Sequence, residues 1–578
     1  MHMRKNATRA LATLVLSIAP LYGSNADSKA AAAPSHAASA WDGYVDRFLE
    51  QHFQANPAFA VNAGRHEFDG RLPDYSADAL RREVARLKQA RADLDAFDTG
   101  VMTAQQRFER DYLRDVLDEK RFWIDEAQWP YRNPEYYLAD LDPDAYLNRP
   151  YAPLETRMRA YIAYAQAVPR AAAQIRANLR TPLPSAWIEY GANAFGGFAD
   201  FYANDVAASF ADVKDSALQQ QLKTADTAAA AAMRELADWL LAQKPQGTQD
   251  FAIGAAMFSR MLEATEQVKL PLERIAEIGR ADLDRNTAAL HAACQQLLPG
   301  GSVEACIAKV RVHKPLDGPV AEARRVLPTL EAFVRKSGLV SIPSDDKALV
   351  AEAPPYNAQN FAYINPPGPY EKTLPAIYYI APPDPQWSAQ QREQYVLPLA
   401  SLTFVSIHEV WPGHFLQFLH SNRSHSRIGQ LFVGYAFAEG WAHYAEETMW
   451  EAGFGNGDPE LHVGQLMQAL WRDVRFMSAI GLHTGKMSLA ESEQMFRDVA
   501  FLDAGNARQQ ALRGTYDPAY LNYTLGKLMI RKLRDDWTAT RGGRAAWHDF
   551  HDALLSYGAP PLPLVRRQML GENAGPAL

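Results

Sequence analysis

Residues 401–417 read Ser-Leu-Thr-Phe-Val-Ser-Ile-His-Glu-Val-Trp-Pro-Gly-His-Phe-Leu-Gln, with histidines at positions 408 and 414. His408 followed directly by Glu409 supplies an imidazole that can bind a metal such as Zn2+ and a carboxylate beside it. His414 is a second imidazole, but six residues further on it lies about 240° around an ideal helix. The spacing of four residues that places two histidines on one helix face is therefore absent.

Pro412 and Gly413 indicate how the two histidines could still meet. Pro412 has no N–H to donate to the carbonyl of His408 and crowds that carbonyl, so a helix must kink or bulge here. A bulge would swing His414 back beside His408. A His-Glu pair near another histidine also occurs by chance, so the metal interpretation depends on further ligands.

A second polar segment, residues 437–447, begins 23 residues after His414 and reads Phe-Ala-Glu-Gly-Trp-Ala-His-Tyr-Ala-Glu-Glu. Glu439, His443 and Glu446 or Glu447 share one face of a helix at this spacing. Two histidines and one glutamate from a following helix would leave the fourth position of a zinc site open. The alternative is a solvated helix face that carries salt bridges.

Together the motifs His-Glu-x-x-Pro-Gly-His and Glu-Gly-Trp-Ala-x-Tyr-Ala-Glu resemble the bacterial domain of unknown function 885 family. That family is similar in motif layout to the glutamate-type zinc peptidases, including angiotensin-converting enzyme and the Taq-type carboxypeptidases. The resemblance covers most of the chain and is most specific over residues 402–530. It implies a mostly helical, two-lobed fold with a deep channel and Zn2+ at its floor.

Carried over position by position, the resemblance implies that Zn2+ is bound by His408, His414 and Glu439. It makes Glu409 the general base that takes a proton from zinc-activated water.

Two later segments that resemble the family, residues 475–483 and 513–526, supply the hydrogen-bond donors that this mechanism still lacks. Tyr523 and His483 are the expected donors to the oxyanion of a tetrahedral intermediate. The residues expected to contact substrate are Arg475, Arg513, Tyr516 and Tyr520. Either arginine could hold a substrate carboxylate, which favours an exopeptidase, or could be a buried partner of Glu446 or Asp473. Each tyrosine or histidine could instead be a structural residue of the core or rim.

Two positions depart from the family pattern. His443 stands where the family is expected to carry an apolar residue, and could be a ligand, a partner of a ligand or a passenger on the helix face. Gln510 stands where an acidic residue is expected, three positions before Arg513, which weakens any inherited salt bridge. Neither change affects the three predicted ligands or the base.

The fold class predicted by helical periodicity is mainly α, as where Phe108, Tyr112 and Val116 repeat after Thr103. Residues 41–345 are expected to form a helical lobe and 346–578 a catalytic zinc-binding lobe, with both able to form one continuous domain. Residues 353–387 are rich in proline and aromatics, and Ile377–Ile380 predicts a short strand near the site. That strand could be an edge that pairs with an extended peptide, or a structural element around the core.

The N-terminus predicts export. Residues 1–26 have a basic start, a short apolar stretch and small residues for cleavage, as in a signal peptide, and 27–40 form an Ala/Ser-rich flexible tether. An uncleaved membrane anchor is the alternative, whereas no cysteine after the expected cleavage site suggests a lipid anchor. We therefore expect a periplasmic or extracellular protein with no membrane span once the signal is removed.

Net charge and cysteine content bear on the possible partners and on the cellular compartment. Removal of residues 1–26 would take away three of the 59 Lys and Arg and none of the 67 Asp and Glu, leaving a net charge of −11. This balance argues against nucleic acid as a partner. Cys294 and Cys306 bracket a Pro-Gly-Gly turn and could form a local disulfide in an oxidising compartment, or both could be free and buried.

The expected function is therefore that of a secreted zinc metallopeptidase acting on peptides. One alternative is a zinc amidase or esterase acting on cell-wall or small-molecule amides, which would use the same ligands. Another is a metal-stabilised binding protein without catalysis. No nucleophile elbow, phosphate-binding loop or dinucleotide fingerprint occurs, so serine-hydrolase and nucleotide-dependent classes are disfavoured.

Overall fold

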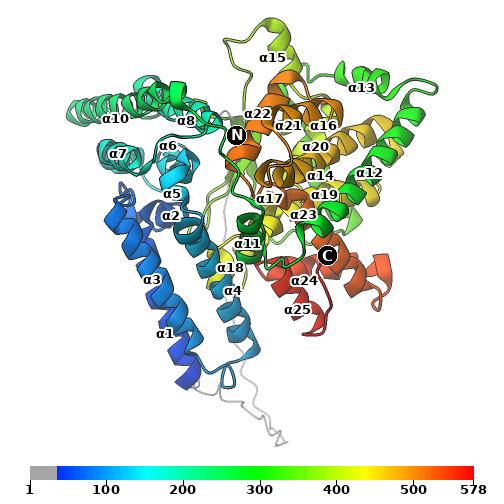
Figure 1. The fold of residues 1–578 in the computed structure, drawn as a ribbon, viewed down its shortest axis with the longest axis horizontal. Helices are drawn as coiled ribbons and strands as arrows, with labels where there is room; N and C mark the ends of the chain where they lie inside the picture. Colours follow the sequence, from blue (N-terminus) through cyan, green and yellow to red (C-terminus); the bar gives the residue numbers. More distant parts are fainter. Residues whose placement is uncertain (1–35, 358–359) are drawn as a thin grey trace, which may run out of the picture.

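The computed structural model describes residues 36–357 and 360–578, and within them the protein is mainly helical, as predicted (Figure 1). The predicted signal segment 1–26 lies outside the described residues, as does most of the predicted tether 27–40. Helix α1 (His36–Ala55) begins inside the tether range, so the last five residues of that range are helical. Among the described residues, no helix combines the length and the apolarity needed to cross a bilayer.

A first lobe packs around its own hydrophobic core. Its larger helices are α1, α3 (Ala77–Asp95), α4 (Ala104–Arg121), α7 (Leu154–Asn178), α8 (Ser185–Asn204) and α10 (Ser216–Ala242). Helix α4 illustrates how the sequence forms these elements: Thr103 and Gln106 make a reciprocal capping box. Phe108, Tyr112 and Val116 then fall on one face and are buried, as the periodicity predicts.

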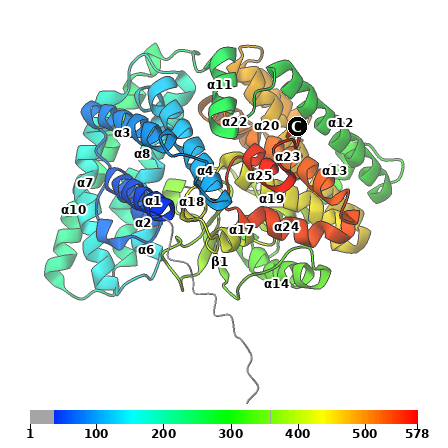
Figure 2. The same cartoon turned by 90° about the horizontal axis from the view of Figure 1, so that it is seen from below.

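A second core holds the polar motifs. Its main helices are α11 (Ala255–Glu266), α12 (Leu272–Leu297), α14 (Pro319–Ser337), α16 (Leu399–Glu409), α17 (His414–Ser421), α19 (Tyr435–Glu451), α20 (Pro459–His483), α22 (Ala504–Tyr516), α23 (Asn522–Thr538), α24 (Trp547–Ser556) and α25 (Leu562–Leu570). Seen from below, the early helices gather on one side and the late helices on the other (Figure 2).

The division between the two cores does not coincide with the predicted boundary at residues 345/346. Helices α11, α12 and α14 precede that boundary, yet Phe258, Ile275 and Leu330 lie in the same core as Phe404 and Trp441. The predicted boundary followed the density of His, Glu and Tyr along the chain. Amphipathic periodicity shows that a helix buries a face but carries no information on which partner covers it.

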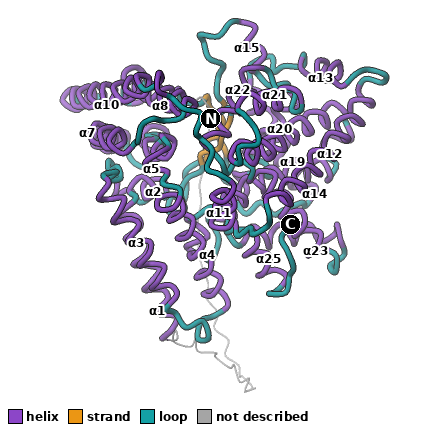
Figure 3. The backbone as a smooth tube through the Cα atoms, viewed as in Figure 1, coloured by secondary structure: helices purple, strands orange, loops and turns teal. Residues whose placement is uncertain are grey.

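Three short strands form a small sheet near the middle of the molecule (Figure 3). The order is β1 (Ala348–Glu352), β3 (Ala376–Ile380), β2 (Ala362–Asn365), with β1 parallel and β2 antiparallel to β3. The strand predicted at Ile377–Ile380 is therefore present, but it is the central strand and not an edge. The edge that faces the helical site is β2, which sequence analysis did not identify.

A disulfide joins Cys294 near the end of α12 to Cys306 in α13 (Val303–Arg311), with Cα atoms 5.6 Å apart. Of the two alternatives for these cysteines, the structure has the bonded one.

Candidate metal centre

The helix that carries His408 ends immediately after it. Helix α16 stops at Glu409, and α17 starts at His414 after a cis Trp411–Pro412 peptide bond. The N–H of Gly413 donates to the carbonyl of Ile407 (3.0 Å), and a Cβ at position 413 would lie 1.7 Å from the carbonyl oxygen of His408. The break predicted at Pro412 is thus a change of helix, and only glycine fits position 413.

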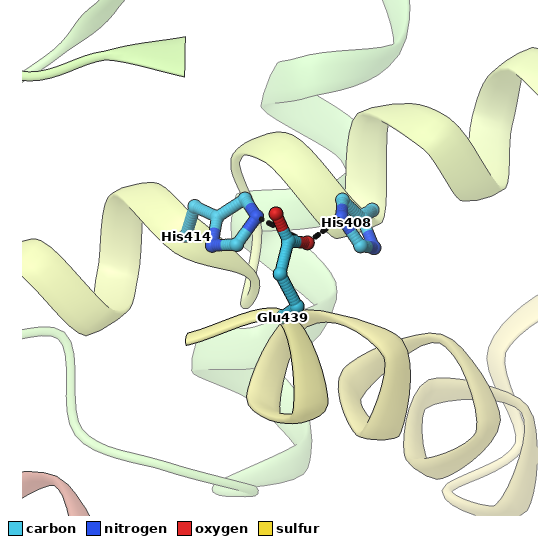
Figure 4. A group of neighbouring side chains, drawn as sticks. All are labelled: His408, His414 and Glu439. Carbon is cyan, nitrogen blue, oxygen red and sulfur yellow. Dashed lines mark hydrogen bonds and ion pairs between the residues drawn. The ribbon is translucent and has the colours of Figure 1, made fainter. Parts of the chain in front are cut away.

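This break brings the two histidines together. Their ring centroids lie 4.8 Å apart, with the rings nearly perpendicular at 88°. Glu439 on α19 reaches between them: its Oε2 lies 3.2 Å from Nε2 of His408 and 3.3 Å from Nε2 of His414 (Figure 4). Among the described residues, these three side chains are the group whose ligand atoms lie close enough together, within 4.8 Å, to hold one metal ion.

The donor set fits zinc. Zn–N and Zn–O bonds of about 2.0–2.2 Å in a tetrahedron place neighbouring ligand atoms roughly 3.3–3.6 Å apart. The two nitrogen–oxygen distances of 3.2 and 3.3 Å are close to this edge length, and all three ligand atoms lie within 4.8 Å of one another. Two imidazoles and one carboxylate also leave one tetrahedral position for water or substrate.

Glu446 lies about two turns beyond Glu439 on α19 and contacts Nδ1 of His408, the ring nitrogen that does not face Glu439. Its Oε1 lies 2.7 Å from Nδ1 of His408 and 3.4 Å from Nη2 of Arg472, and its side chain is fully buried. Burial opposes the charged carboxylate, but Arg472 and the hydrogen bond to His408 hold the pKa of Glu446 well below its usual value. An ionised Glu446 accepts a hydrogen bond from the Nδ1–H of His408, and this tautomer leaves Nε2 free to bind a metal.

His443 lies beside Glu446 and outside the group of three. Its ring is fully buried, with Nδ1 3.6 Å from Oε1 of Glu446. Burial lowers the pKa of His443 to about 4, so the imidazole is neutral at physiological pH. Of the three roles considered for His443, the geometry favours that of a partner: His443 lies beside Glu446, which in turn contacts His408.

Glu409 is buried next to the three clustered side chains. It is 6% exposed, and burial raises the pKa of its carboxyl, against the opposing charges of His408 and His414. The carboxylate makes no hydrogen bond or ion pair with another described side chain. Glu409 therefore lies close to the cluster, and burial raises its pKa, which strengthens the ionised carboxylate as a proton acceptor.

A pocket, here called the site pocket, opens over His408 and Glu409. Four of the predicted residues also line it: Arg475, Arg513, Tyr516 and Tyr523. The Tyr523 ring stacks near that of His408, with centroids 6.1 Å apart. Burial raises the pKa of Tyr523, so its hydroxyl keeps its proton and remains a hydrogen-bond donor.

Comparison with known proteins identifies the family. A family model described as "Bacterial protein of unknown function (DUF885)" matches residues 57–569. The chain belongs to this family. No curated protein matches the chain.

Two solved structures share the fold of this DUF885 chain. A candidate lipoprotein of unknown function from Shewanella oneidensis is 24% identical, with a TM-score of 0.74 over 92% of this chain and 99% of that one. A candidate lipoprotein from Colwellia psychrerythraea is 16% identical, with a TM-score of 0.78 over 92% and 98% of the two chains. At these identities the likeness concerns the fold.

Two predicted site residues of the DUF885 chain lie elsewhere. His483 is fully buried at the end of α20, where its Nε2 is 2.7 Å from the carbonyl oxygen of Gly514 and its ring packs near Phe251 and Phe258. Tyr520 is also fully buried, with its hydroxyl close to Gly514. Neither residue lines the site pocket, so the structure corrects both assignments.

Two supporting residues were not predicted from the sequence. Arg472, which pairs with Glu446, follows no motif that would distinguish it from other arginines of α20. Trp441 donates from Nε1 to the carbonyl oxygen of Pro412 (2.9 Å) and so fixes the α16–α17 connection. A signal for Trp441 was present, because it lies inside the Glu-Gly-Trp-Ala motif.

Proposed function

We propose that this DUF885 chain is an exported zinc-dependent hydrolase that cleaves peptide bonds, with His408, His414 and Glu439 as ligands. The observation that carries the proposal is the convergence of two Nε2 atoms on one carboxylate oxygen at zinc-like spacing, next to the buried Glu409. The order of these residues along the chain, which resembles the glutamate-type zinc peptidases, supports it further.

The chain's own residues account for the proton transfers. A bound Zn2+ would supply Lewis-acid polarisation of the substrate carbonyl and a nucleophile at neutral pH. Glu409 takes a proton from the attacking water and delivers it to the leaving amine. The hydroxyl of Tyr523 donates to the carbonyl oxygen as negative charge develops on it.

An unpaired Glu409 speaks against a purely structural metal site. Burial of a carboxylate without a protein partner carries a desolvation cost, which appears here as the raised pKa of Glu409. A purely structural metal site, with all its positions filled by ligands, would not need such a carboxylate beside it. A catalytic site requires such a group next to the ligands.

The edge strand β2 favours peptides over small amides or esters. Phe361 and Ala362 line the site pocket, and the next residues of β2 line a larger cleft between the two lobes. The strand thus runs from the site pocket into the cleft, and one of its edges is unpaired in the sheet. An extended peptide can add to such an edge through main-chain hydrogen bonds.

Three observations support export. Residues 1–26 have the pattern of a signal peptide, and the bond between Cys294 and Cys306 is typical of an oxidising compartment. The two structural relatives are described as candidate lipoproteins, which are exported proteins.

The deciding experiment measures metal content and peptide cleavage together in wild type, Glu409→Ala and His414→Ala, with His425→Ala as an exposed control. We expect about one zinc per wild-type chain, as in sites of this ligand type. Glu409→Ala should keep zinc and lose cleavage, His414→Ala should lose both, and His425→Ala should change neither. A wild type that binds no metal would refute the proposal, and cleavage that survives Glu409→Ala would refute the mechanism.

A further inference from the structure

Arg475 is a buried cation at the wall of the site pocket. It projects from α20, is only 7% exposed, and lines the pocket together with His408 and Glu409. Its Cζ lies 4.6 Å from the ring centroid of Tyr523 and 5.4 Å from that of Trp471. The guanidinium is thus held beside the phenol that stacks on the metal-ligand histidine.

Arg475 differs from its neighbours in having no carboxylate partner. Arg472 pairs with Glu446 at 3.4 Å, and Arg513 pairs with Asp517 at 3.0 Å. Within residues 36–357 and 360–578, Arg475 forms no ion pair, and its Nε donates to the neutral amide oxygen of Gln510 at 2.8 Å. Burial and the charges of the other two arginines lower the pKa of Arg475, which is the expected effect on an uncompensated buried cation.

We propose that Arg475 binds a carboxylate of the substrate and so places the scissile bond over His408 and Glu409. The proposal rests on the proposed hydrolase function and names its substrate class: peptides that carry a carboxylate close to the bond that is cleaved. A guanidinium whose terminal nitrogens are free can hold a carboxylate with two parallel hydrogen bonds. The carboxylate can come from the C-terminus, which makes the enzyme a carboxypeptidase, or from an acidic side chain.

Gln510 is what keeps Arg475 available. A glutamate at this position would place a permanent carboxylate 2.8 Å from Nε and neutralise the guanidinium without substrate. Glutamine holds the same geometry through a neutral oxygen. Gln510→Glu is therefore a nearly isosteric test that retains Arg475 and its packing.

The test measures binding of three blocked peptides to the full-length protein carrying Glu409→Gln, which prevents turnover. The probes are acetyl-Ala-Ala-Phe with a free C-terminus, the same peptide as its C-terminal amide, and acetyl-Ala-Ala-Glu amide. Each is titrated by calorimetry against the Glu409→Gln background alone and with Arg475→Gln, Gln510→Glu or the control Arg508→Gln. Arg508 is a partly exposed arginine on the same helix as Gln510.

We expect one carboxylate form to bind about 10- to 100-fold more tightly than the amide, as for other hydrogen bonds to charged groups. Preference for the free C-terminus assigns a carboxypeptidase, and preference for the Glu-amide peptide assigns an acidic side chain. Both Arg475→Gln and Gln510→Glu should abolish the preference, and Arg508→Gln should keep it. Equal binding of all three probes, or no binding of any, overturns the carboxylate anchor.

Zinc content and cleavage dependent on Glu409 are measured separately on protein with Glu409 intact. A protein that passes that measurement but does not prefer a carboxylate refutes the anchor alone. A protein that prefers a carboxylate through Arg475 but holds no zinc refutes the hydrolase and retains the anchor.

Discussion

Nδ1 of His408 lies 2.7 Å from Oε1 of Glu446, 38 residues further along the chain. A carboxylate behind a ligating histidine fixes the orientation of its ring and raises its basicity. The contact joins α16 to α19, so the helix that carries Glu439 also holds the first histidine in place.

Glu446→Gln should weaken zinc binding by about 10- to 100-fold, the usual effect of losing such a partner. The amide retains the size of the side chain but loses the charge that Arg472 and His408 face. Zinc affinity is measured by competition with a chelator. The matched control is Glu447→Gln on the same helix, because Glu447 pairs with Arg285 and Arg531 and does not contact His408. Equal zinc affinity of wild type and Glu446→Gln would contradict the assignment.

Gly413→Ala should disrupt the α16–α17 connection. The new Cβ would lie 1.7 Å from the carbonyl oxygen of His408 and 2.4 Å from that of Ile407, and both are backbone atoms that cannot rotate away. We expect a loss of about 1–3 kcal/mol or more in the free energy of unfolding, as for overpacked sites, together with a loss of zinc. The control is Gly196→Ala in α8, where the new Cβ meets only the flexible Arg234 at 3.4 Å. Urea unfolding and metal content would check both, and a stable, zinc-binding Gly413→Ala protein is the contrary result.

The free energy of unfolding should fall at alkaline pH as His66 loses its proton. Burial alone lowers its pKa, but hydrogen bonds with Asp69 and Glu371 raise it to about 9. Because this folded-state pKa exceeds the unfolded value of about 6.5, protonated His66 stabilises the native state. The contribution is complete below about pH 6.5 and is lost as the pH rises through about 9. His66→Gln should therefore destabilise the protein more at pH 6 than at pH 10. The exposed His425→Gln serves as control, and a pH-independent loss in His66→Gln would argue against the ion pairs.

Replacing both cysteines by alanine should destabilise the α12–α13 hairpin without affecting the site. The bond closes a short loop, since the cysteines are 12 residues apart, and the chain-entropy model assigns about 3 kcal/mol to a loop of this size. Urea unfolding measures this loss, and zinc content should stay at the wild-type level. Unchanged stability of the double variant would show that the bond does not constrain the unfolded chain.

The sequence predicted which side chains meet better than it predicted their surroundings. That His408, His414 and Glu439 come together, with their possible ligand atoms within 4.8 Å, could be predicted because motif spacing and a helix-breaking proline act locally. His483 was assigned to the site from the sequence but does not line the site pocket. It lies eight residues beyond Arg475 on α20, which is about 12 Å further along the helix axis. The central position of β3 and the lobe boundary depend on contacts between distant segments. Such contacts leave no periodic signal in a single sequence.

Tyr523 and Tyr520, predicted from the sequence as an oxyanion donor and a substrate contact, should differ in their effect on activity. Tyr523 lines the site pocket beside His408, whereas Tyr520, three residues earlier, is fully buried in the core. Loss of one oxyanion donor lowers kcat by about 10²- to 10³-fold, so Tyr523→Phe should cause a fall of this size. KM and zinc content should change little, because the lost hydrogen bond strengthens only as charge develops in the transition state. Tyr520→Phe should leave kcat near the wild-type value. If both variants lose activity equally, the hydroxyl of Tyr523 has no special place in the reaction, and the donor to the carbonyl oxygen must be sought among Arg475 and Arg513.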